Sequence, residues 1–166
     1  DLAISKKDVA DYTAIVSAQI HIDDNGPIIY ILPNPVNERL TFPDQVRRIK
    51  DVVRIVNNGY NSPVVVEEVA YQRAMCHALN EDGETVIPFH PHGKDKRTRL
   101  ALTSAAIHTA RVRFPQQGTE HLIQQLVGFG VERHDDLADA FAMLVLQALK
   151  DYEKISNEPV MMVIET

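Results

Sequence analysis

The chain carries a cluster of carboxylates where a long apolar helix is expected to begin. Residues 134–140 read HDDLADA and contain three acids, Asp135, Asp136 and Asp139. Asp136 and Asp139 are three residues apart, so they share one face of a helix, and this face continues into apolar residues. Two like charges about 4 Å apart repel by roughly 4 kcal/mol at a protein surface, and a divalent cation between them would remove that cost. The segment therefore predicts either a metal site or a helix start with several capping acids.

Other acids stand at the ends of expected core elements. Asp1 opens the chain, and Glu67 and Glu68 directly follow the apolar run Val64–Val66. Sites in α/β sheets gather at the carboxyl ends of strands, so these acids could meet the cluster at residues 135–139. Oxygen ligands of this kind suit Mg²⁺ or Mn²⁺. Each acid alone also has a structural interpretation, for example Asp1 as a frayed terminus or Glu68 as an acid at a helix start.

A basic segment is a candidate for binding phosphates. Between positions 94 and 113 the chain has six basic residues and one acid, Asp95, although the net charge of the whole chain is −6. The segment could contact a polyanion or could simply be a solvated helix face. The sequence GKDKRTR at positions 93–99 lacks the spacing of a nucleotide-binding phosphate loop, and no other segment supplies it.

Composition limits the class of protein. The 166 residues are enough for one domain with a genuine core, and the hydrophobic (45%) and charged (24%) fractions are those of a globular protein. The sequence has neither a signal peptide nor an apolar run long enough to span a membrane. Cys76 is the single cysteine, which excludes internal disulfides and cysteine-based zinc sites and fits a reducing compartment.

The elements that must position these side chains alternate between strands and helices. β-branched residues and a DDNG turn at 23–26 predict a hairpin of strands 11–22 and 28–32. Apolar spacing and turn residues then predict strands at 64–66, 84–89 and 111–114, and helices at 42–56, 69–79, 120–129 and 135–152. The polar segment 90–99 is predicted as a surface loop that leads into a further helix ending at about Thr109. Residues 160–164 could form a further strand or an arm. This order indicates an α/β domain with a mixed sheet.

Several short motifs, taken in order, resemble those of a known family. They are DLAIS (1–5), DYTA (11–14), VVVEE (64–68), GKDKRTR (93–99) and HDDLADA (134–140). Their order and spacing resemble the nuclease domain of the large terminase subunit of tailed bacteriophages, over nearly the whole chain to about Tyr152. The resemblance implies an RNase H-like fold, in which a mixed β-sheet is flanked by helices on both faces.

The resemblance also implies roles for individual residues. Asp1, Glu67 and Asp136 match the acidic motifs of the catalytic site, where two Mg²⁺ or Mn²⁺ ions are expected. Asp1 would bridge both ions, and Glu67 and Asp136 would each hold one. Asp139 is a further candidate metal ligand, and the candidate supporting acids are Asp135, Asp11 and Glu68. Candidate contacts to the DNA backbone are Lys94, Lys96, Arg97 and Arg99.

A matching family member would be a metal-dependent endonuclease that cuts double-stranded viral DNA during genome packaging, with little sequence preference. Its expected partners are DNA, the terminase small subunit, the portal and an ATPase domain, in the host cytoplasm and without a membrane. Because no phosphate loop is present and a strand is expected before Asp1, we predict that residues 1–166 are a single C-terminal nuclease domain of a longer terminase. The alternatives are another RNase H-like nuclease, such as a Holliday-junction resolvase, and an inactive docking module of a packaging motor.

Overall fold

The structure is a computed structural model that describes residues 12–57, 62–67, 72–131 and 134–157. The predictions made for Asp1, Asp11, Glu68 and the segment 160–164 therefore lie outside the described residues. Within the described part, the expected alternation of strands and helices is present in full.

The N-terminal region forms the expected hairpin, with two differences. Residues 12–23 form two strands, β1 (Tyr12–Ile15) and β2 (Ala18–Asp23), instead of one. β2 pairs antiparallel with β3 (Gly26–Ile31), and Gly26 adopts a φ of 120° at the turn, a conformation that favours glycine. An unexpected strand, β4 (Val36–Arg39), pairs antiparallel with β1. Its four residues, VNER, are too short and too polar to show a strand pattern in the sequence.

The middle of the chain places Glu67 at the end of a strand. Helix α1 (Phe42–Asn57) precedes β5 (Val64–Glu67), which is followed by α2 (Gln72–Glu81) and β6 (Val86–Phe89). β5 and β6 pair in parallel, and α2 contacts both strands as the crossover helix between them. The apolar run Val64–Val66 is therefore the parallel strand that its composition predicted, and the carboxylate of Glu67 belongs to its last residue.

The C-terminal half is mainly helical. It contains α3 (Lys96–His108), the short strand β7 (Val112–Arg113), α4 (Glu120–Val127) and α5 (Asp136–Asn157). The predicted loop 90–99 was wrong over residues 96–99, because Asp95 caps the helix and α3 begins directly after it. β7 pairs in parallel with β3. The described strands thus form three hydrogen-bonded groups, β1–β4, β2–β3–β7 and β5–β6, which include both parallel and antiparallel pairs. This confirms the predicted α/β class with mixed strand pairing.

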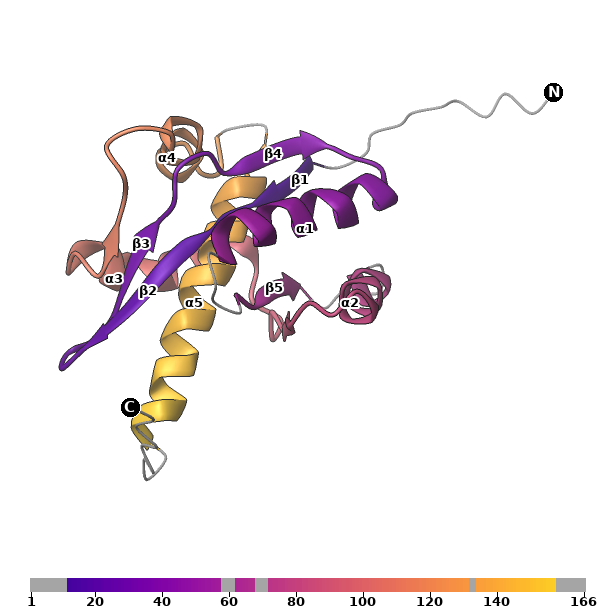
Figure 1. Cartoon of the computed structure of the whole chain (residues 1–166). Helices are drawn as coiled ribbons and strands as arrows, with labels where there is room; N and C mark the ends of the chain where they lie inside the picture. The colour runs from indigo at the N-terminus through magenta and orange to yellow at the C-terminus, as the bar shows by residue number, and fades with distance from the viewer. Residues whose placement is uncertain (1–11, 58–61, 68–71, 132–133, 158–166) are drawn as a thin grey trace.

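Helix α5 packs against all three groups of strands, because it contacts β1, β4, β3 and β5 as well as α3 and α4 (Figure 1). Its apolar face supplies Leu137, Phe141 and Val145 to the main core, where each is fully buried. The ring of Phe141 stacks on Phe114 with 5.7 Å between ring centroids. The acids in the first turn of α5 are therefore attached to a helix that packs against every described group of strands. None of the described helices is long and apolar enough to cross a bilayer.

Candidate active site

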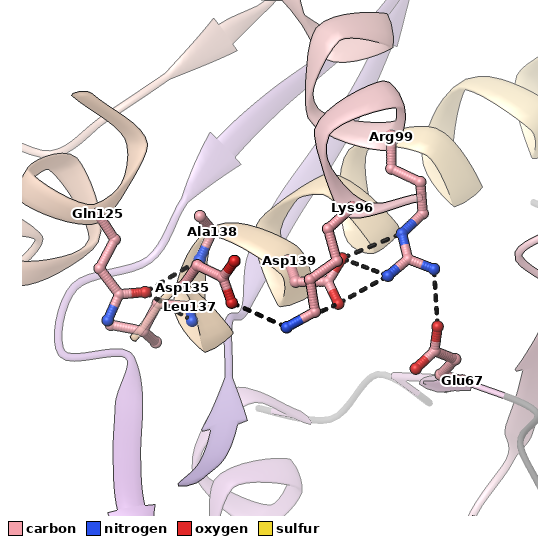
Figure 2. Close-up of polar contacts among 8 residues, drawn as sticks. All are labelled: Glu67, Lys96, Arg99, Gln125, Asp135, Leu137, Ala138 and Asp139. Atoms are coloured by element: carbon pink, nitrogen blue, oxygen red, sulfur yellow. Dashed lines mark hydrogen bonds and ion pairs between the residues drawn. The ribbon is translucent and has the colours of Figure 1, made fainter. Parts of the chain in front are cut away.

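Charged side chains from three elements that are distant in the sequence meet at one place (Figure 2). Glu67 comes from the end of β5, Lys96 and Arg99 come from the first turn of α3, and Asp135 and Asp139 come from the start of α5. We call these five residues the charge cluster.

Arg99 lies at the centre of the charge cluster. Its Nη2 donates to both carboxylate oxygens of Asp139, at 2.7 and 2.8 Å, and its Nε donates to Oδ1 at 3.0 Å. The remaining amino group, Nη1, donates to Oε1 of Glu67 at 2.7 Å. Arg99 and Asp139 are only 4% and 8% exposed, so this is a buried ion pair with the planar, two-pronged geometry that guanidinium groups favour.

Burial and pairing have opposite effects on these charges. Burial raises the pKa of the Asp139 carboxyl, and the hydrogen bonds and positive charge of Arg99 act against that rise, with a smaller contribution from Lys96. Burial alone would lower the pKa of Arg99, but the hydrogen bonds and negative charges of Asp139 and Glu67 raise it above its usual value. Arg99 is therefore a fixed cation, and the carboxylate of Asp139 depends on it for stabilisation.

Lys96 forms the outer, more solvated part of the charge cluster. Its Nζ lies 2.8 Å from Oδ1 of Asp135 and 4.0 Å from Oδ2 of Asp139. Burial lowers the pKa of Lys96, but the hydrogen bond and charge of Asp135 outweigh this effect and raise it, with help from the negative charges of Asp139 and Asp136. Asp136 is thus close enough to interact electrostatically, and among the described residues no side chain or backbone group donates a hydrogen bond to its carboxylate.

The start of α5 is capped by a residue of another helix. The buried side chain of Gln125, in α4, accepts hydrogen bonds through Oε1 from the backbone N–H groups of Leu137, at 2.8 Å, and Ala138, at 3.3 Å (Figure 2). The carboxylates of Asp135 and Asp136 accept no such bond from the described backbone, so the expectation that these acids cap the helix by hydrogen bonds was wrong. Asp136 and Asp139 do lie in the first turn of α5, where negative charge complements the helix dipole. Capping by Gln125 leaves both carboxylates available for other partners.

We expect Gln125→Met to destabilise the domain by about 1–3 kcal/mol, because two buried N–H groups lose their acceptor while the volume of the side chain is retained. Within the described residues the Nε2 group of Gln125 has no partner, so its removal offsets part of this loss. Chemical denaturation would measure the change. Val127→Met, at an 85% exposed position of the same helix, is the control and should stay within about 0.5 kcal/mol of the wild type.

The structure brings together several of the residues that the sequence singled out. Glu67, Lys96, Arg99, Asp135 and Asp139 are in direct contact. The positions of Asp1, Asp11 and Glu68 lie outside the described residues. No group of three or more histidine, cysteine or acidic side chains among the described residues is arranged to hold a metal ion.

The expected set of DNA-backbone contacts needs a correction. Arg99 is buried, and its donors are directed at carboxylates, so it cannot meet a phosphate in this conformation. The sequence grouped it with the exposed basic residues because position in a basic run carries no information about burial. Lys94, Lys96 and Arg97 are exposed. Gly130 has a φ of 85°, and a Cβ there would lie 2.8 Å from Nη2 of Arg97, so the turn after α4 leaves room for this guanidinium.

Two contributors to the site were missed in the sequence. Gln125 gave no signal, because a glutamine inside an amphipathic helix normally faces solvent. The pairing of Arg99 with Asp139 could have been suspected from the apolar face of α5, since a carboxylate that faces a core requires a cationic partner. A ring contact also ties β1 to the site, because Tyr12 lies against His134 with 4.8 Å between ring centroids.

A family model described as the terminase RNase H-like domain matches residues 1–148, which is most of the chain. The chain belongs to the terminase RNase H-like domain family. This confirms the resemblance and the fold class that the ordered motifs predicted. A comparison with curated proteins found no match.

Solved structures agree with this terminase assignment at the level of the fold. The chain is similar to the large terminase nuclease from thermophilic phage G20c with bound zinc, at a TM-score of 0.53 and 19% identity, over 86% of this chain and 82% of that one. It is also similar to the same nuclease with bound magnesium, at a TM-score of 0.52 and 17% identity, over 82% of each chain.

The donor set of the terminase domain is chemically suited to a hard divalent cation. The carboxylates of Glu67 and Asp139 already converge on one positive group, the guanidinium of Arg99, and the acids Asp135 and Asp136 lie beside them. All of these ligand atoms are oxygens, which Mg²⁺ and Mn²⁺ prefer. The chemistry of these oxygen donors therefore fits a divalent ion, although in the described part of the chain they are paired with Arg99 and Lys96 and are not gathered around a metal site.

Proposed function

We propose that this terminase domain is a metal-dependent endonuclease that hydrolyses double-stranded DNA. The observation that carries the proposal is the convergence of Glu67, from the end of β5, with the acids at the start of α5, which lie about seventy positions further along the chain. Membership of the terminase RNase H-like family supports it, and so do neighbours whose names describe a large terminase nuclease with zinc or magnesium.

Glu67 and Asp136, together with Asp1, are the proposed ligands of two Mg²⁺ or Mn²⁺ ions. Oε2 of Glu67 and both carboxylate oxygens of Asp136 accept no hydrogen bond from the described residues, whereas both oxygens of Asp139 accept bonds from Arg99. Asp135, Asp11 and Glu68 are the proposed supporting acids. A divalent ion bound here would act as a Lewis acid and lower the pKa of a coordinated water.

Lys94 and Arg97 are the proposed contacts to the DNA backbone, since both are exposed and lie at the start of α3, beside the charge cluster. Lys96 can join them by exchanging Asp135 for a phosphate. Contacts of this kind hold a duplex without reading its sequence, so we expect little sequence preference.

The proposed setting is viral genome packaging in the host cytoplasm. There the domain would act beside an ATPase domain, the terminase small subunit and the portal. These partners are proposed from membership of the terminase family.

Incubation of the purified domain with supercoiled plasmid tests the proposal. We expect conversion to linear and shorter products with Mn²⁺ or Mg²⁺ and none with EDTA. Parallel reactions with linear duplex, a four-way junction and an RNA–DNA hybrid compare the proposal with the alternatives. A strong preference for the junction or the hybrid would favour another nuclease of this fold, and no cleavage with any metal, alone or joined to an ATPase domain, would favour a docking module.

A further inference from the structure

We propose that Arg99, fixed by Asp139, is a positioning residue that orients Glu67 for metal binding, and that Asp139 anchors Arg99 instead of binding metal. The proposal rests on the proposed function, because it concerns a carboxylate assigned there as a ligand. It gives a role to the most buried ion pair among the described residues, Arg99 and Asp139.

The contacts form an ordered chain from the core to the surface. Asp139 is held by the backbone of the well-packed helix α5, and both of its oxygens are taken up by three hydrogen bonds from Arg99. This leaves Nη1 as the terminal group of Arg99 that reaches β5, where it donates to Oε1 of Glu67 at 2.7 Å. The planar guanidinium therefore transmits the position of α5 to the end of β5.

Burial decreases along the same chain. The side chains of Arg99 and Asp139 are 5% and 10% exposed, and that of Glu67 is 20% exposed. Among the described residues, Oε2 of Glu67 accepts no hydrogen bond. One oxygen of Glu67 is thus held from inside and the other remains open to a ligand, which is the usual arrangement for a carboxylate supported by an outer partner at a metal site.

Two other roles for Arg99 make opposite predictions. As a plug, its guanidinium would occupy the place of the cation, and its loss would tighten metal binding. Alternatively, Asp139 could itself be a metal ligand that pairs with Arg99 only while no metal is bound. In that case the loss of Asp139 would weaken binding whether or not Glu67 is present.

The experiment replaces the buried pair as a unit with Arg99→Met/Asp139→Leu, because apolar side chains of similar volume avoid leaving a lone buried charge. Mn²⁺ binding is measured by calorimetry on four proteins: the wild type, the pair variant, Glu67→Gln, and the triple variant. This is a double-mutant cycle between the pair and Glu67. We expect the pair variant to bind Mn²⁺ about 10–100-fold more weakly than the wild type, and no further weakening when the pair is replaced in the Glu67→Gln background.

A second, metal-free measurement uses side-chain couplings of Glu67 in solution by NMR. We expect one dominant rotamer in the wild type and averaged couplings in the pair variant. If the wild type binds no Mn²⁺, the proposed function fails, and the couplings alone still decide whether Arg99 positions Glu67. Four results would each overturn the positioning role. Three concern Mn²⁺ affinity: tighter binding by the pair variant, unchanged binding by the pair variant, or an equal loss of affinity when the pair is replaced in the wild type and in Glu67→Gln. The fourth is that the Glu67 couplings stay the same in the pair variant.

Discussion

The variant Asp136→Asn is expected to lose Mn²⁺-supported plasmid cleavage by more than about a hundredfold while the domain remains folded. Asparagine keeps the size of the side chain but removes the charge, and replacing even an outer partner of a metal ligand costs about 10–100-fold. Because α5 is capped by Gln125 and not by Asp136, the substitution leaves the described capping bonds intact. Cleavage rates and thermal melting curves of the two proteins would measure both effects.

Asp151→Asn is the matched control for this prediction, since Asp151 lies on the same helix but outside the charge cluster, where it accepts a hydrogen bond from Gln147 at 2.8 Å. It should cleave at the rate of the wild type. Full activity of Asp136→Asn would remove Asp136 from the proposed ligand set and leave Asp135 as the candidate from α5.

Replacing Arg99 alone with methionine is expected to lower the free energy of unfolding by about 3–5 kcal/mol, because the buried carboxylate of Asp139 loses its partner. Replacing both members of the pair, as Arg99→Met/Asp139→Leu, should recover most of this loss, since no uncompensated charge stays inside. Urea denaturation of both variants would give the two values.

Arg97→Met provides the comparison at an exposed position of the same helix turn and should change stability by no more than about 0.5 kcal/mol. If the single Arg99 variant were as stable as the pair variant, the ion pair would be more solvated than its 4% and 8% exposure indicates.

Most helices and strands of this fold could be predicted from the sequence, because the residue patterns that specify them are local. The DDNG turn, the valine run before Glu67 and the apolar spacing of α1 and α5 each specify one element. The features that could not be predicted depend on contacts between residues that are distant in the chain. β4 exists because β1 offers it an edge, and the division between β1 and β2 accompanies a hydrogen bond from Leu32 N to Ser17 O at 2.8 Å.

The site shows the same limit at the level of side chains. Sequence order was enough to predict that Glu67 and the acids of α5 belong together, since strand ends and helix starts meet in α/β folds. It could not show that Arg99 faces inward, because its neighbours Lys96 and Arg97 face outward on the same turn and all three are basic. Nor could it show that Gln125, in α4, would cap α5. The cap of α3 is local, because Asp95 accepts a hydrogen bond from the N–H of Thr98 at 2.7 Å.

The composition of the charge cluster bears on the order in which a complex could assemble. Glu67, Asp135, Asp139 and the adjacent Asp136 outnumber the two cations, Lys96 and Arg99, and one of those cations is enclosed. A polyanion approaching these residues alone would therefore be repelled at close range. Under the proposed function, a bound divalent ion supplies counter-charge before a duplex comes close. Divalent ions and nucleic acid are therefore expected to bind with positive cooperativity, each raising the affinity of the protein for the other.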